Sequence, residues 1–182
     1  MLDKHLQRAM APVSAWIAPR IAAIPPIALV LAVIAAGAGA FAAIAMRNYI
    51  PGLGLLFLSK VFVASLGSGE KENSDKDSGL GSVAYLIDVL LWGSLPFAFA
   101  LADPSRAIAA SFLTLSLLVL NSANSSPSSV PQLIERAELF AAFAIACVMP
   151  QWFGPVSYIF GVLCFLSAGM RIAETFATFG EQ

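Results

Sequence analysis

The apolar positions of the chain fall into six runs, separated by short stretches that are polar or rich in Pro and Gly. An α-helix rises about 1.5 Å per residue, so about 20 apolar residues cross a hydrocarbon core of roughly 30 Å. We therefore predict six transmembrane helices, which form one membrane domain over residues 24–179. Their expected limits are Ile24–Met46, Tyr49–Leu66, Leu80–Leu101, Ala107–Leu120, Leu133–Met149 and Val156–Phe179. The fourth run is short for a crossing, and we expect its helix to extend into the following "NSAN".

A different pattern precedes the first run. Over residues 1–23, apolar side chains recur at helical spacing with charged residues between them. The apolar positions are Leu2, Leu6, Met10, Val13 and Ile17. This pattern predicts an amphipathic helix that lies in the membrane interface rather than crossing the bilayer.

The composition favours the same class of protein. Hydrophobic residues make up 59% of the 182 residues and charged residues 12%, and the mean hydropathy is +0.83. These values lie far from those of a soluble globular domain. A net charge of −1 offers no basic surface to nucleic acid. We therefore expect an all-α integral membrane protein that does not bind DNA or RNA.

The positive charges predict the orientation, because Lys and Arg favour the cytoplasmic ends of short loops. An inside N-terminus leaves only Arg47 and Arg106 on the outer side. It places eight other basic residues at or near the inner side: Lys4, Arg8, Arg20, Lys60, Lys71, Lys76, Arg136 and Arg171. Both termini and the polar loop of residues 67–79 are then cytoplasmic. The Ala-rich, short-looped chain is typical of a bacterial inner membrane protein.

Cysteine and histidine exclude several kinds of site. Cys147 and Cys164 both fall within apolar runs, so neither a disulfide framework nor a thiolate zinc site has the required spacing. His5 is the only histidine of the chain and lies in its polar N-terminal stretch. Ser-His-Asp catalysis and a multi-histidine metal site are therefore not expected.

Two charged residues stand inside apolar runs. Lys60 lies six residues before the end of the second run, and Asp88 lies eight residues into the third. A charge near the bilayer centre costs about 2.5–3.5 kcal/mol, so each calls for a partner or a function. The two residues lie at similar depth on adjacent predicted helices, which makes them an ion-pair candidate. Lys60 could instead extend its ammonium group to the inner surface, whereas Asp88 is too short to do so.

A further charged group opens the fifth run. Glu135 and Glu138 are three residues apart, which places both carboxylates on one helical face, with Arg136 between them. They could point into the bundle. They could equally form a solvated first turn, since acidic side chains suit a helix N-terminus.

Three stretches of the chain are similar to those of a known family. They are "LGSVAYLIDVLLWGSLPFAFALADP" (Leu80–Pro104), "IERAELFAAF" and "YIFGVLCFLSAGMRI" (Tyr158–Ile172). In these stretches, and in its order of elements, the chain resembles the CDP-alcohol phosphatidyltransferases, which build phospholipids in membranes. The resemblance implies an amphipathic N-terminal helix, a six-helix bundle and a cytoplasmic turn between the second and third spans. It also implies pairing as a homodimer.

The hallmark of that family runs Asp-x2-Asp-Gly-x2-Ala-Arg-x8-Gly-x3-Asp-x3-Asp, and its four aspartates hold two divalent metals. The metals bind the CDP pyrophosphate and help to activate the attacking alcohol. Here the resemblance places the fourth aspartate at Asp88 and the other three at Ala64, Gly67 and Ala84. The strict spacing of the hallmark, counted from Ala64, ends one residue later, at Tyr85 and Val89, and neither register has an aspartate at the third position. This chain therefore resembles the family with most of its catalytic aspartates missing.

Three functions remain open. The first is a non-catalytic protein of phospholipid metabolism, with a lipid-binding, partner or scaffold role and no cofactor. The second is a divergent transferase that moves a phosphatidyl group from a CDP-linked donor to an alcohol. It would rebuild a Mg²⁺ or Mn²⁺ site from Asp88 and the loop acids Glu70, Glu72, Asp75 and Asp77. The third is a small ion or proton-coupled transporter that uses Asp88. The expected partners are membrane lipid and either a second copy or another membrane protein.

Overall fold

The computed structural model describes residues 25–69, 78–123 and 136–179. The amphipathic helix predicted for residues 1–23 lies outside these residues, as does most of the polar loop. Within the described residues the elements are all helical. They are α2 (Pro26–Ala45), α3 (Tyr49–Gly69), α4 (Ser78–Ala102), the 3₁₀ turn η1 (Pro104–Arg106), α5 (Ala107–Ala123), α6 (Arg136–Val148), the 3₁₀ turn η2 (Pro150–Trp152) and α7 (Phe153–Phe179).

The all-α prediction is confirmed for the described part of the chain. Three of its segments are long and apolar enough to cross a membrane, namely Ile27–Ala45, Pro104–Ala123 and Pro150–Ala177. Three shorter apolar segments are Tyr49–Val63, Val89–Ala102 and Glu138–Val148. Each of the six long helices overlaps one predicted run, but the number of crossings stays a prediction.

The helix limits differ from the predicted ones where proline is involved. The first helix begins at Pro26 rather than Ile24, because the residue before a proline avoids the helical region, and Pro25 has an extended backbone. The last helix begins at Phe153, so the expected start at Val156 is wrong by three residues. Pro155 lies in its first turn, where a proline costs no hydrogen bond. The extension of the fourth run into "NSAN" is observed, since α5 ends at Ala123.

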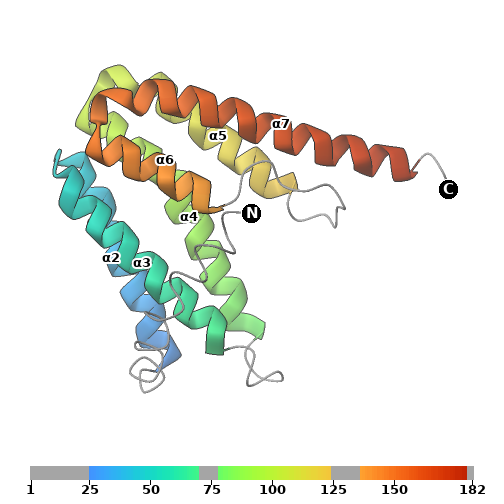
Figure 1. Cartoon of the computed structure of the whole chain (residues 1–182). Helices are drawn as coiled ribbons and strands as arrows, with labels where there is room; N and C mark the ends of the chain where they lie inside the picture. The colour runs from blue at the N-terminus through green and yellow to red at the C-terminus, as the bar shows by residue number, and fades with distance from the viewer. Residues whose placement is uncertain (1–24, 70–77, 124–135, 180–182) are drawn as a thin grey trace. The chain divides into compact units, whose positions relative to one another are not determined.

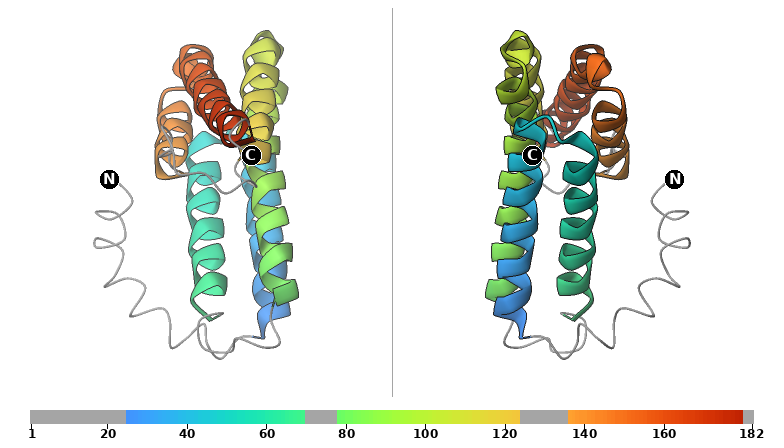
Figure 2. Two further views of the ribbon diagram at one scale, coloured as in Figure 1. Left: turned by 90° about the vertical axis from the view of Figure 1, so that its right-hand side faces the viewer. Right: turned by 90° about the vertical axis from the view of Figure 1, so that its left-hand side faces the viewer.

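The chain divides into two compact units, residues 1–91 and 92–182, which are described separately. In the first unit, α2 and α3 form an antiparallel hairpin (Figures 1 and 2). The turn between them is a Schellman motif. The N–H of Arg47 donates to the Ile44 carbonyl at 2.9 Å, and the N–H of Asn48 donates to the Ala43 carbonyl at 2.8 Å. Arg47 adopts the left-handed conformation, with φ of 64°, which glycine usually supplies.

Small residues let α2 and α3 approach closely. Ala40 and Ile44 of α2 are fully buried, and so is Leu56 of α3. At Gly52 of α3, an added Cβ would lie 2.6 Å from Ile44 Cγ1 and 3.3 Å from the Ala40 carbonyl oxygen. The second atom belongs to the backbone of α2, so it cannot rotate away. Gly52 is therefore required by the distance between the two helices.

In the second unit, α5 and α7 pack side by side and run in the same direction (Figure 1). Gly161 of α7 lies against Phe112 and Ser116 of α5, where an added Cβ would clash with the Phe112 ring. Stacked aromatic rings join other helices of the unit. The ring centroids of Phe99 in α4 and Phe153 in α7 are 4.4 Å apart, and Phe99 also stacks on Phe143 of α6 at 6.4 Å. These contacts fix the core of the unit.

Substitution of Gly52 tests the close contact between α2 and α3. We expect Gly52→Val to lower the free energy of unfolding by about 1–3 kcal/mol, because the new side chain overlaps the buried Ile44 side chain and crowds the Ala40 carbonyl of α2. Gly54 is a matched control on the same helix, since nothing lies within 4 Å of a Cβ added there. Gly54→Val should leave thermal unfolding in detergent nearly unchanged. Equal effects of the two substitutions would contradict the observed packing.

Candidate functional site

The two charges predicted to form an ion pair lie on α3 and α4. Lys60 is half-buried on α3. Asp88 lies on α4 within the same unit, although its side chain is outside the described part of the structure. Whether the two side chains meet therefore stays a prediction.

The helix limits strengthen the argument from depth. Lys60 lies nine residues before the end of α3 at Gly69, and Asp88 lies ten residues after the start of α4 at Ser78. At 1.5 Å per residue, the two positions are roughly 14 and 15 Å along their helices from the loop that connects them. Both helices continue further toward this loop than the apolar runs predicted, and the two depths remain matched.

The positions of the missing family aspartates are also on these helices. Ala64 and Gly67 belong to α3, before the loop, and Ala84 belongs to α4, after it. All three positions are therefore helical. Asp75 and Asp77, which a rebuilt metal site would recruit, are outside the described residues. Among the residues that the structure describes, no three His, Cys, Asp or Glu side chains come together as metal ligands would.

The charged group at the fifth run is described only in part. Arg136 is the first residue of α6, and Glu138 is half-buried in its first turn. Glu135 and the side chain of Arg136 are outside the described part. The choice between a bundle-facing and a solvated arrangement therefore stays open for these residues.

The second unit contains polar side chains that the sequence analysis did not single out. The buried face of α7 carries Ser157, Ser167 and Arg171, with exposed fractions of 1%, 1% and 9%. The Oγ atoms of both serines and the Nε atom of Arg171 are buried without a hydrogen-bond partner in the described structure. Buried polar atoms are normally hydrogen-bonded, so each such atom calls for an explanation.

Other polar side chains in the same unit are satisfied within it. The Thr114 hydroxyl of α5 donates to the Gly93 carbonyl of α4 at 3.1 Å, and the Ser116 hydroxyl donates to the Leu113 carbonyl at 2.7 Å. Arg106 Nη1, at the start of α5, is a further buried atom without a hydrogen-bond partner in the described structure, and Ser157, Ser167 and Arg171 form a strip on the buried face of α7. Its only charged member is Arg171.

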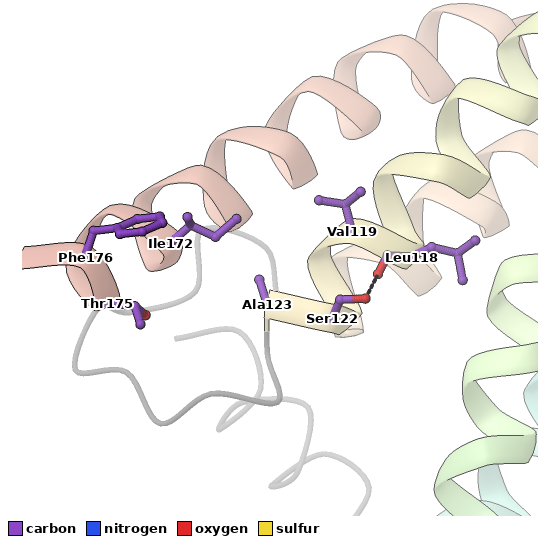
Figure 3. Close-up of a pocket in the computed structure, with 7 residues that line it drawn as sticks. All are labelled: Leu118, Val119, Ser122, Ala123, Ile172, Thr175 and Phe176. Atoms are coloured by element: carbon purple, nitrogen blue, oxygen red, sulfur yellow. Dashed lines mark hydrogen bonds between the residues drawn. The ribbon is translucent and has the colours of Figure 1, made fainter. Parts of the chain in front are cut away.

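A groove lies between the last turns of α5 and α7 (Figure 3), and Ile172, the next residue after Arg171 in the chain, is part of its lining. Its volume is about 480 Å³, and both helices contribute to its lining: Leu118, Val119, Ser122, Ala123, Ile172, Thr175 and Phe176. The lining is mostly apolar. The Ser122 hydroxyl donates to the Leu118 carbonyl at 2.9 Å, and the Thr175 hydroxyl donates to the Arg171 carbonyl at 2.9 Å.

Sequence reasoning treated Arg171 only as a charge that sets orientation. The signal that could have found it was the same as for Lys60, namely a cation within an apolar run. The two serines and the groove carry no comparable signal, because their burial depends on which helices pack together.

Comparison with known proteins gives one informative match. The chain is 25% identical over 200 residues to "Inner membrane protein YnjF" of Escherichia coli (strain K12), in an alignment that covers 98% of this chain and 97% of that protein. No family model matches the chain, and no solved structure matches it. This full-length similarity, together with helices long and apolar enough to cross a bilayer, shows that the chain is an integral membrane protein with transmembrane helices.

A double-mutant cycle tests the predicted pair of Lys60 and Asp88. We expect Lys60→Met and Asp88→Leu each to lower the free energy of unfolding by roughly 3–5 kcal/mol, because each strands the other charge in a medium of low dielectric. The double mutant should recover much of this loss, as measured by thermal unfolding in detergent. Additive losses would show that the two residues do not interact.

Proposed function

We propose that this chain is a non-catalytic membrane protein of phospholipid metabolism, built like the CDP-alcohol phosphatidyltransferases and acting by lipid binding, or as a partner or scaffold. One observation carries the proposal. Of the four positions at which the resemblance places metal-binding aspartates, three are Ala64, Gly67 and Ala84, and only Asp88 is retained.

The chemistry of these residues explains why the loss matters. Divalent cations such as Mg²⁺ need several oxygen ligands, and alanine and glycine side chains supply none. A lysine ammonium such as that of Lys60 could neutralise a lone Asp88 within the membrane. It cannot bridge a pyrophosphate and activate an alcohol as a pair of metal ions does. The site would therefore keep its charge balance and lose its reaction.

The arrangement of the chain in the membrane is part of the proposal. We propose six crossings with both termini cytoplasmic, and a bacterial inner membrane as the location. Three observations support this: the order of six long helices, the apolar character of each, and the name of the Escherichia coli relative as an inner membrane protein. The distribution of Lys and Arg favours the same orientation.

An activity assay tests the proposal. The purified chain is expected to transfer no phosphatidyl group from a CDP-activated lipid to any common alcohol acceptor, with either Mg²⁺ or Mn²⁺ present. An active enzyme of the resembled family, assayed in the same detergent and lipid, serves as the positive control. Turnover by the unmodified chain that is lost in Asp88→Asn would overturn the proposal and establish the divergent transferase instead.

A further inference from the structure

Arg171 is the starting point of a second site, in the other unit of the chain. Its side chain is 91% buried, since only 9% is exposed, and its Nε atom has no hydrogen-bond partner in the described structure. The ion pair that is described in this unit joins Arg106 Nε to Asp103 Oδ2 at 3.2 Å, at the start of α5 rather than at its end. Glu174 follows one turn later on α7 and is half-buried.

The position of Arg171 along its helix indicates what could balance its charge. It lies 18 residues after the first residue of α7, Phe153, which corresponds to roughly 27 Å of helix. A hydrocarbon core is about 30 Å thick, so Arg171 lies close to one boundary of the core. Lipid phosphates lie just beyond that boundary. A buried arginine at this depth is therefore within reach of an anionic headgroup.

The groove between α5 and α7 lies at the same level. The two helices run in the same direction, so the last turn of α5, with Leu118 and Ser122, lies beside Ile172 and Thr175 of α7 (Figure 3). Ile172 adjoins Arg171 in the chain, and Thr175 is one turn away and bonded to its carbonyl. A volume of about 480 Å³ is in the usual range of ligand sites.

Different residues suit the apolar part and the anionic part of a possible ligand. The apolar side chains of the groove suit hydrocarbon, and they are partly open to the surroundings, with Leu118 47% and Phe176 73% exposed. The hydroxyl hydrogens of Ser122 and Thr175 are directed to carbonyls of their own helices. Among the described residues at this end of α5 and α7, Arg171 is a charged donor suited to an anion, since a guanidinium binds phosphate oxygens in a fixed two-pronged geometry.

We propose that Arg171 and the groove between α5 and α7 form a binding site for one anionic membrane phospholipid. The guanidinium binds the lipid phosphate, and one acyl chain lies in the groove against Leu118, Val119, Ile172 and Phe176. This site rests on the lipid-binding role within the proposed function and names the class of lipid, and lipid could bind in the second unit whether or not transfer chemistry occurs beside Asp88. A failure to bind lipid at Arg171 would contradict this site alone, whereas transferase activity that depends on Asp88 would contradict the proposed function.

Lipid retention by the full-length protein tests this site. The protein is purified in detergent, incubated with phosphatidylglycerol or phosphatidylcholine, and examined by native mass spectrometry. The unmodified chain should retain phosphatidylglycerol in preference to phosphatidylcholine. Arg171→Gln should reduce the retention of phosphatidylglycerol roughly tenfold, because a charged hydrogen bond is lost. Arg47→Gln, which removes an exposed arginine from the other unit, is the matched control and should leave retention unchanged.

A second variant keeps the experiment decisive if Arg171→Gln fails to fold. Leu118→Trp fills the groove from a half-exposed position and leaves the guanidinium in place, and it should also reduce retention. Retention unchanged in both variants, or equal retention of the two lipids by the unmodified chain, would overturn the proposal. Displacement of the lipid by millimolar inorganic phosphate would also overturn it, since the site would then be one for a free anion.

Discussion

A charge held within a bilayer must be balanced, because the hydrocarbon core supplies neither counter-ions nor water. Most of this chain avoids the problem by placing apolar side chains along its helices. Charged residues within the helices include Lys60 and Asp88 on α3 and α4, and Arg171 on α7. We propose a neutralising partner for each of them. Lys60 and Asp88 neutralise each other in the first unit, and a lipid phosphate neutralises Arg171 in the second. The proposed roles of the two units both follow from this one requirement.

The same requirement connects the missing aspartates to the retained one. In the family that the chain resembles, four carboxylates are balanced by two divalent cations. With Ala64, Gly67 and Ala84 at three of those positions, two metal ions would be in excess of the remaining negative charge. A single ammonium group at the depth of Asp88 would restore neutrality without metal. The helices of this chain contain small residues that allow close packing, such as Gly52 against Ile44. Under the proposed function, the bundle of the resembled family would be retained while its transfer reaction is lost.

The sequence predicted the fold better than the site. Six apolar runs identified six helices in their order, because helices that face lipid need only length and apolar side chains. Their ends were less accurate, since Pro25 delays the first helix while Pro155 is tolerated in the first turn of the last. Lys60 could be recognised because a charge in an apolar run is visible without a structure. The burial of Arg171 and the groove between α5 and α7 could not be recognised from the sequence. Both depend on the packing of α5 against α7, which lies about 50 residues further along the chain.

The central claim is that the carboxylate on α4 is balanced by a cation of the chain itself rather than by divalent metals. Titration of the purified protein with Mn²⁺, followed by electron paramagnetic resonance, measures this most directly, because bound and free Mn²⁺ give different signals. The account predicts no specific Mn²⁺ binding that depends on Asp88. Two equivalents of tightly bound Mn²⁺, released by Asp88→Asn, would contradict it.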